Sequence, residues 1–108
     1  MRDNAERVRR VYRPMTETGF YILYCLQEEM HGYNIVQRVR QLTAGGIVIS
    51  AGTMYGSLSK MEEDGLIAFT REEGKRRLYV ITGLGREILE EELRRIERLY
   101  KNSRGECV

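Results

Sequence analysis

The sequence has few of the residues that form metal centres, disulfide frameworks or membrane spans. It contains one histidine and two cysteines, and it offers no recognised metal-ligand spacing. Cys25 falls in an apolar helical pattern and Cys107 near the end, which indicates no disulfide framework and fits a reducing cytoplasm. No apolar run approaches the roughly 20 residues that a transmembrane helix requires, and the charged first residues differ from a signal peptide. We therefore expect a cytoplasmic protein with no membrane anchor, metal or other cofactor.

Signatures of catalysis are missing as well. The sequence has no Ser/His/acid constellation and no glycine-rich phosphate-binding loop of the required form. The adjacent carboxylates of Glu62, Glu63 and Asp64 fall at a predicted helix end, which is typical of a solvated turn. We predict that the protein is not an enzyme.

The composition predicts one ordinary globular domain with a modest core, since 42% of its 108 residues are hydrophobic and 31% are charged. A net charge of +2 does not by itself indicate nucleic-acid binding, but the basic residues are unevenly distributed. They gather in two groups, Arg2, Arg7, Arg9, Arg10 and Arg13 in the first and Lys75, Arg76 and Arg77 in the second.

Residues 1–15, which contain the only proline, Pro14, are predicted to be a basic N-terminal arm. Their pattern fits a short helix or a flexible segment. The arm either reaches a phosphate backbone or is a frayed, solvated terminus.

Residues 50–65 read as one short helix around which the chain is organised. Ser50 suits the N-cap and Gly65 suits the left-handed conformation that ends a helix. Met54, Leu58 and Met61 form an apolar face. The opposite face is small and polar near its start, which suits close approach to another surface and hydrogen bonds to phosphates or base edges. An ordinary amphipathic surface helix is the alternative.

Two more helices precede this one. Residues 16–28, with Thr16 as the cap, are apolar nearly all round, so we expect burial on more than one side and partial packing against a second chain. His31 begins the next helix, to about Ala44, and we interpret it as a capping or packing residue.

Residues 47–49 are a short extended run with room for one or two ladder pairs. Residues 66–71 and 76–82 read as a β-hairpin whose tip carries Lys75, Arg76 and Arg77.

A last helix is predicted over residues 83–102, capped by Thr82, followed by a disordered tail over 103–108. Its apolar residues step by four, three and four, a coiled-coil-like seam that we assign to dimerisation: Leu89, Leu93, Ile96 and Tyr100. A helix this long cannot bury its whole seam on so small a domain, so we expect a partner helix. Packing against residues 16–28 of the same chain is the alternative, and both can hold at once.

This order of elements predicts an α+β, mostly helical fold, a winged helix-turn-helix over residues 16–82 with a C-terminal dimerisation helix. In such a fold the third helix enters the major groove and the hairpin wing lies along the DNA backbone. A monomer offers few contacts, so useful affinity requires two half-sites and a two-fold dimer. Tyr55 either contacts phosphate or packs at the helix edge. The predicted DNA-binding residues are Thr53, Tyr55, Gly56, Ser59, Lys60, Lys75, Arg76 and Arg77.

Over about residues 18–90 the sequence resembles the PadR-like transcriptional regulators. The motifs that carry the resemblance are His31-Gly32-Tyr33, Ser50-Ala51-Gly52-Thr53-Met54-Tyr55, Leu58 with residues 61–67, residues 74–79, Ile81-Thr82 and Gly85. The resemblance implies a cytoplasmic repressor that is dimeric through its C-terminal and first helices. It also implies binding to operators and release by a small, often aromatic compound.

The sequence departs from the family at two helix starts. Ala51 and Gly83 stand where the family usually or often has proline, which is pre-organised for the first position of a helix. The chain resembles the short subfamily, which has no separate C-terminal helical domain. An effector therefore has to bind between protomers, where no tryptophan is present as a stacking platform; the residues we expect there are Tyr21, Tyr24, Leu93, Ile96 and Tyr100.

We thus predict a sequence-specific, ligand-responsive repressor that acts as a homodimer on a palindromic operator. The alternative is a winged-helix protein-interaction module without operator binding. The basic wing and the small outer face of the helix after Ser50 favour DNA.

Overall fold

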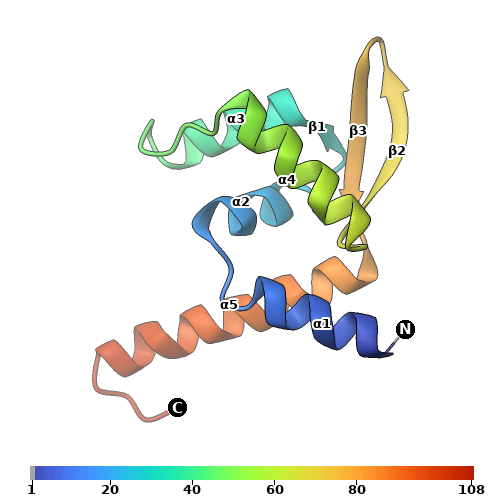
Figure 1. Ribbon diagram of the computed structural model, residues 1–108. Helices are drawn as coiled ribbons and strands as arrows, with labels where there is room; N and C mark the ends of the chain where they lie inside the picture. The colour runs from blue at the N-terminus through green and yellow to red at the C-terminus, as the bar shows by residue number, and fades with distance from the viewer. Residues whose placement is uncertain (1) are drawn as a thin grey trace.

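A computed structural model describes residues 2–108, which form five helices and three short strands (Figure 1). Met1, part of the predicted arm, lies outside the described residues. The elements follow one another as α1 (Arg2–Tyr12), α2 (Glu17–Cys25), β1 (Met30–His31), α3 (Gly32–Leu42), α4 (Ala51–Glu63), β2 (Ile67–Glu73), β3 (Arg76–Ile81) and α5 (Gly83–Ser103).

Polar caps set the helix starts where the sequence predicts them. The Ser50 hydroxyl accepts a hydrogen bond from the Thr53 N–H at 3.2 Å. His31 Nδ1 accepts one from the Asn34 N–H at 3.2 Å, which confirms its capping role. At the end of α4, Gly65 takes a φ of +82° and the Leu66 N–H donates to the Met61 carbonyl. These caps fix both ends of α4.

The sheet differs from the prediction in its third strand. Strands β2 and β3 form the expected antiparallel hairpin, from Ile67 opposite Ile81 to Glu73 opposite Arg76. The other edge of β3 pairs with β1, not with residues 47–49, so the sheet order is β1-β3-β2. Residues 47–49 form no ladder. They bury Ile49, pack the half-buried Ile47 against the core and leave Val48 61% exposed, so their apolar pattern reflects contact with the core and not a strand.

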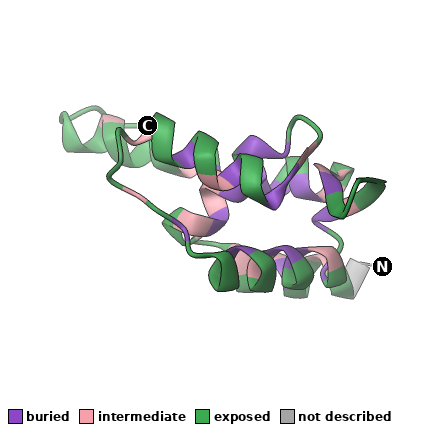
Figure 2. Cartoon of the chain, turned by 90° about the horizontal axis from the view of Figure 1, so that it is seen from above, coloured by how far each residue is buried: buried purple, intermediate pink, exposed green. Residues whose placement is uncertain are grey.

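The core lies between α2, α3, α4, the sheet and the start of α5. Its fully buried side chains include Ile22, Leu26, Ile35, Leu58, Leu66 and Ile88. Buried segments face the interior, and the outer helix surfaces are exposed (Figure 2). This core holds α3 against α4 and leaves the outer side of α4 uncovered.

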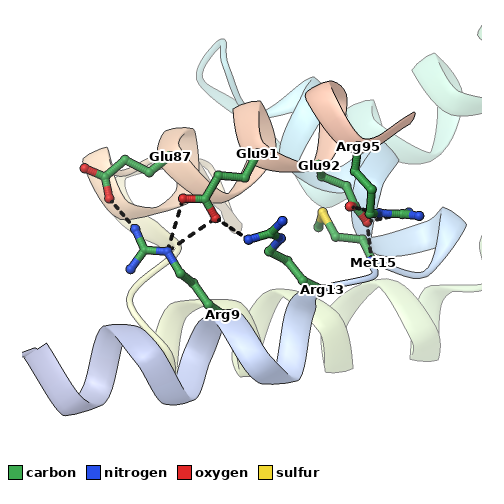
Figure 3. Close-up of polar contacts among 7 residues, drawn as sticks. All are labelled: Arg9, Arg13, Met15, Glu87, Glu91, Glu92 and Arg95. Carbon is green, nitrogen blue, oxygen red and sulfur yellow. Dashed lines mark hydrogen bonds and ion pairs between the residues drawn. The ribbon is translucent and has the colours of Figure 1, made fainter. Parts of the chain in front are cut away.

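Helix α1 lies beside the first half of α5 (Figure 1). Val8 is fully buried. Figure 3 shows Arg9 between two glutamates of α5, with Nη2 2.9 Å from Glu87 Oε2 and Nε 3.2 Å from Glu91 Oε2; Arg13 also pairs with Glu91 at 3.1 Å. The expectation of a frayed, solvated terminus is therefore wrong for residues 4–12, because acidic α5 side chains and core contacts of Val8 and Tyr12 hold this segment.

Glu92 marks the point at which the buried half of α5 ends. Its side chain is 1% exposed and accepts hydrogen bonds from the Met15 backbone N–H and from Arg95 Nη2, the latter at 3.0 Å (Figure 3). The bond from Arg95 holds the pKa of the Glu92 carboxyl below its usual value. The carboxylate thus ties the connection between α1 and α2 to α5.

The end of the chain also differs from the prediction of a disordered tail. Ser103 belongs to α5, and the residues after it fold back on the helix end. The Glu106 N–H donates to the Lys101 carbonyl at 3.1 Å, and Gly105 takes a φ of +86°. This is the left-handed turn that satisfies the last helix carbonyls. Within residues 2–108, no helix is long and apolar enough to cross a membrane.

Candidate nucleic-acid interface

Helix α4 presents two unlike faces. Met54, Leu58 and Met61 are buried as the sequence predicts. The five α4 residues expected to contact DNA are all exposed on the rest of the helix: Thr53, Tyr55, Gly56, Ser59 and Lys60. A Cβ atom added at Gly52 or Gly56 meets nothing within 4 Å. These glycines therefore serve no internal packing, and they keep the outer surface low enough for another molecule to come close.

Helix α3 supports α4 from behind. A Cβ at Gly32 would lie 3.1 Å from the Met54 side chain and 3.4 Å from the Tyr55 ring, so the first turn of α3 contacts α4 closely. Tyr55 is 58% exposed even so, which leaves its hydroxyl end accessible. The contact fixes the direction of α4 relative to the sheet.

The wing, which we define as β2, β3 and their turn at Gly74–Lys75, extends away from the helices (Figure 1). The sequence suggested a single basic cluster at its tip, but the structure separates the three side chains. Lys75 lies in the turn and is exposed, and no carboxylate among residues 4–108, whose side chains the structure describes, pairs with it. Arg76 and Arg77 lie on successive positions of β3 and therefore face opposite sides of the hairpin.

Arg76 is directed toward the start of α3. Its guanidinium carbon lies 4.9 Å from the centre of the Tyr33 ring, and its Nη1 lies 3.3 Å from His31 Nε2. Tyr33 is 50% exposed. It is a candidate DNA-facing residue that the sequence interpretation did not assign, although it stands in the His31-Gly32-Tyr33 motif and its aromatic ring lies on the polar side of α3.

Arg77 is directed toward the end of α4. Its guanidinium carbon lies 4.1 Å from the Phe69 ring centre, its Nε donates to the Tyr79 hydroxyl at 3.0 Å, and its Nη2 lies 3.6 Å from Glu62 Oε2. The hydrogen bond to Tyr79 raises the pKa of the guanidinium above its usual value. Arg77 is thus held within the wing, while Lys75 is free to meet a phosphate. The candidate interface combines a hydroxyl-bearing helix face with four cations: Lys75 in the turn, Lys60 beside Asp64, and the positioned Arg76 and Arg77.

The predicted dimerisation seam divides into two parts. Leu89 is 2% exposed and belongs to the core of its own chain. Leu93, Ile96 and Tyr100 are 43%, 42% and 61% exposed, and Leu99 beside them is 47% exposed. The assignment of Leu89 to dimer contact is corrected accordingly: the domain reaches one helical turn farther along α5 than its sequence spacing indicated.

The residues predicted to hold an effector lie on two separate elements. Tyr21 and Tyr24 flank Phe20 on α2, with ring centres 5.5 and 6.3 Å from it. Leu93, Ile96 and Tyr100 lie on the exposed half of α5.

Comparisons with known proteins agree with this geometry. The model of the Transcriptional regulator PadR-like family matches residues 22–91. The transcriptional regulator YqjI of Escherichia coli (strain K12) is 29% identical over 82 residues, which cover 76% of this chain and 40% of YqjI. The chain thus spans less than half the length of that curated relative.

Solved structures give the same fold. A transcriptional regulator from Clostridium thermocellum is 30% identical, with a TM-score of 0.68 over 83% of this chain and 91% of the other. Bacillus subtilis PadR in complex with operator DNA has a TM-score of 0.64 and 23% identity, over 72% of this chain and 47% of the other, and its likeness concerns the fold alone. The predicted winged helix-turn-helix is confirmed.

Proposed function

Because the chain belongs to the PadR-like family of transcriptional regulators, we propose that it binds DNA sequence-specifically, as a homodimer on a palindromic operator, and represses transcription until a small ligand releases it. The observation that carries the proposal is the outer face of α4, small and rich in hydroxyls, beside a wing with an exposed lysine at its turn. Bacillus subtilis PadR, which shares the fold, is described in complex with operator DNA. A polyanion with grooves fits this combination better than a protein surface does.

The residues take different roles in this proposal. Thr53 and Ser59 lie on the exposed face of α4, where hydroxyls reach base edges in the major groove. Lys60 and Lys75 neutralise phosphates and release counterions. Arg76 and Arg77, held on either side of the wing by aromatic rings, set the position of the hairpin against the backbone.

The exposed half of α5 supports the homodimer. Leu93, Ile96, Leu99 and Tyr100 place four large apolar side chains on one helix, and an apolar patch of this kind is typical of an interface. Two-fold pairing of identical patches then presents two copies of α4, which is what a palindromic operator requires. Repression follows where such a dimer occupies a promoter.

A titration by fluorescence anisotropy tests the proposal. The DNA upstream of the protein's own gene is compared with a shuffled duplex of equal length and composition, at several salt concentrations. We expect a preference of about 10³-fold or more for the natural DNA, as for specific binders, with a stoichiometry of two protomers per duplex. Thr53→Ala should reduce that preference, whereas Lys75→Ala should weaken binding to both duplexes equally.

Weak binding without preference to any duplex drawn from that region would contradict the proposal. A pull-down with the immobilised protein would then test the interaction-module alternative, since retention of a partner by the wild type but not by Arg76→Ala would assign the wing to protein contact.

A further inference from the structure

His31 is the only histidine of the chain, and both of its ring nitrogens face N–H donors. On one side, Nδ1 accepts a hydrogen bond from the Asn34 N–H at 3.2 Å, as the cap of α3. On the other side, Nε2 lies 3.3 Å from Arg76 Nη1. A neutral imidazole has one donor and one acceptor, so the cap leaves the proton on Nε2. The Nε2–H and the guanidinium are therefore both donors and cannot satisfy each other.

The burial of His31 means that this pair of donors needs an acceptor. The His31 side chain is 7% exposed, and a buried N–H without an acceptor is destabilising. The two nitrogens are 3.3 Å apart, so one oxygen atom at about 2.8 Å from each can accept from both. Arg76 is exposed, which leaves its side of the pair accessible to a ligand.

The charges around this pair favour an anionic oxygen. No carboxylate among residues 4–108, whose side chains the structure describes, pairs with Arg76, because Glu73 opposite it on the hairpin pairs with Arg71 at 3.3 Å. Within α3, which is described in full, the first turn has no acidic residue to neutralise the positive end of the helix dipole. The Tyr33 ring, whose centre lies 4.9 Å from the guanidinium carbon, holds Arg76 in this position.

The pair joins the wing to the start of α3. Arg76 is the first residue of β3, whereas His31 ends β1 and caps α3. The next residue, Gly32, packs against α4, since a Cβ atom there would lie 3.1 Å from the Met54 side chain and 3.4 Å from the Tyr55 ring. An anion bound by His31 and Arg76 therefore bridges two elements that flank the candidate DNA-binding helix.

We propose that His31 and Arg76 form an oxyanion site, in which the imidazole Nε2–H and the guanidinium donate to one phosphate oxygen, and that a phosphodiester of the DNA backbone occupies it. The second half rests on the proposed function. Because the site contacts phosphate and no base, it contributes equally to all DNA sequences. One phosphate then links α3 to the wing and fixes the wing on the DNA.

The single histidine makes its protonation directly measurable. In protein labelled with ¹⁵N-histidine, long-range ¹H–¹⁵N spectra at neutral pH should show a proton on Nε2 and none on Nδ1. Addition of the shuffled duplex should shift the Nε2 signal strongly and the Nδ1 signal little, because only Nε2 contacts the phosphate. A proton on Nδ1, or an unchanged Nε2 signal in DNA-saturated protein, would overturn the site.

His31→Asn removes the Nε2–H and keeps the cap, because asparagine is a favoured N-cap residue. Its helix content by circular dichroism should equal that of the wild type. We expect its affinity to fall ~10-fold for natural and shuffled duplexes alike, as for one lost hydrogen bond to a charged group. The salt dependence should not change, because the imidazole is neutral, whereas Arg76→Gln should lower it by about one phosphate contact. Wild-type affinity in a folded His31→Asn would contradict the proposal.

A double-mutant cycle tests whether one phosphate contacts both groups. His31→Asn combined with Arg76→Gln should bind no more weakly than the weaker single variant. His31→Asn combined with Lys75→Ala is the matched control, because Lys75 in the turn contacts a different phosphate and the two losses should add. Additive losses for His31 and Arg76 would refute a shared phosphate.

Failure of this site and failure of the proposed function give different results. Equal binding of natural and shuffled duplexes by the wild type would refute operator recognition, but the spectra and the variants still test the site on either duplex. If the wild type binds no duplex, the DNA half fails with the proposed function. A titration with inorganic pyrophosphate then decides whether the site binds an oxyanion, and an unchanged Nε2 signal would overturn that half as well.

Discussion

The two helices α4 and α5 both leave a surface uncovered, but the surfaces differ in kind. The exposed side of α4 carries mainly glycines and hydroxyls, with Lys60 and Glu63 near its end, whereas the last part of α5 exposes Leu93, Ile96, Leu99 and Tyr100. Water solvates the first surface well and the second poorly. Exposure alone therefore does not identify a partner; side-chain chemistry is what supports the proposed roles, DNA contact for α4 and contact with a second protomer for α5.

The largest loss of dimerisation and of operator affinity is expected when the exposed apolar part of α5 is made polar. Ile96→Glu places a charge in the middle of the exposed patch, so we expect a monomer in analytical ultracentrifugation and at least a 100-fold loss of operator affinity. Lys101→Glu, on the same helix but outside the patch, is the control for charge. A dimer that persists in Ile96→Glu would assign the patch to another role.

Glu92→Gln tests where the domain ends and the uncovered half of α5 begins. The buried carboxylate holds Arg95 and the Met15 N–H, so its loss should lower the free energy of unfolding by about 1–3 kcal/mol. Glu90→Gln, an exposed neighbour, should have little effect. Urea titrations at pH 7 give the comparison.

Wild type and Glu92→Gln should also differ in how their free energies of unfolding depend on pH. The pKa of Glu92 is lowered in the folded protein, so its stabilisation is complete above the unfolded value of about 4.5 and is lost as pH falls through the folded pKa. The stability difference between wild type and Glu92→Gln should be constant above pH 5 and shrink below pH 4.5. A difference that grows toward acid pH would contradict this assignment.

On α4, replacement of Thr53 should change specificity more than stability. Its hydroxyl is exposed, so Thr53→Val should leave the melting temperature within a few degrees and reduce discrimination between operator and mismatched sites by about 1–3 kcal/mol. Competition binding with single-mismatch duplexes measures this. An equal loss of affinity for all duplexes would indicate that Thr53 contacts the DNA backbone and not the bases.

Lys75→Ala should cause a smaller loss of DNA affinity, and the loss should be equal for all DNA sequences. The lysine is unpaired in the described chain, so its removal should lower the salt dependence of binding by about one phosphate contact. Arg77→Ala should also disturb the Phe69 and Tyr79 packing and so lower stability, which Lys75→Ala should not. Salt titrations and thermal melts of the two variants separate charge from packing.

The smallest effect is expected at the start of α5. A Cβ atom added at Gly83 would meet nothing within 4 Å, and Thr82 before it is extended, as a residue before proline prefers. Gly83→Pro should therefore raise the free energy of unfolding by up to about 1 kcal/mol. Differential scanning calorimetry would show it, and a lowered melting temperature would indicate that the Gly83 N–H is needed.

Local rules predicted most helices and the wing, because Ser50, Thr16, Thr82 and Gly65 carry their signals within a few residues. The sequence placed the third strand at residues 47–49, whereas Met30–His31 pairs with β3 in the structure. Both segments are short and strand-like in sequence. Which of them pairs depends on which one reaches the free edge of β3, and this is a property of the whole fold.

The sequence left the N-terminal residues open between a short helix and a flexible segment, and it did not predict that they dock on α5 or that Leu89 is buried in its own chain. Arg9 pairs with Glu87 and Glu91 about 80 residues later, and Val8 and Leu89 join one core; no local pattern encodes such long-range contacts.

Gly85 shows how one backbone contact can govern spacing on DNA. A Cβ atom there would lie 2.2 Å from the Leu66 carbonyl oxygen, so any side chain would push the root of α5 away from the sheet. From Gly85 to Tyr100 the helix runs ~22 Å, so a tilt of ~10° at the root would move its far end by ~4 Å. In the proposed dimer, joined through that end, Gly85 would set the distance between the two copies of α4, and hence the separation of the half-sites that the proposed dimer would contact.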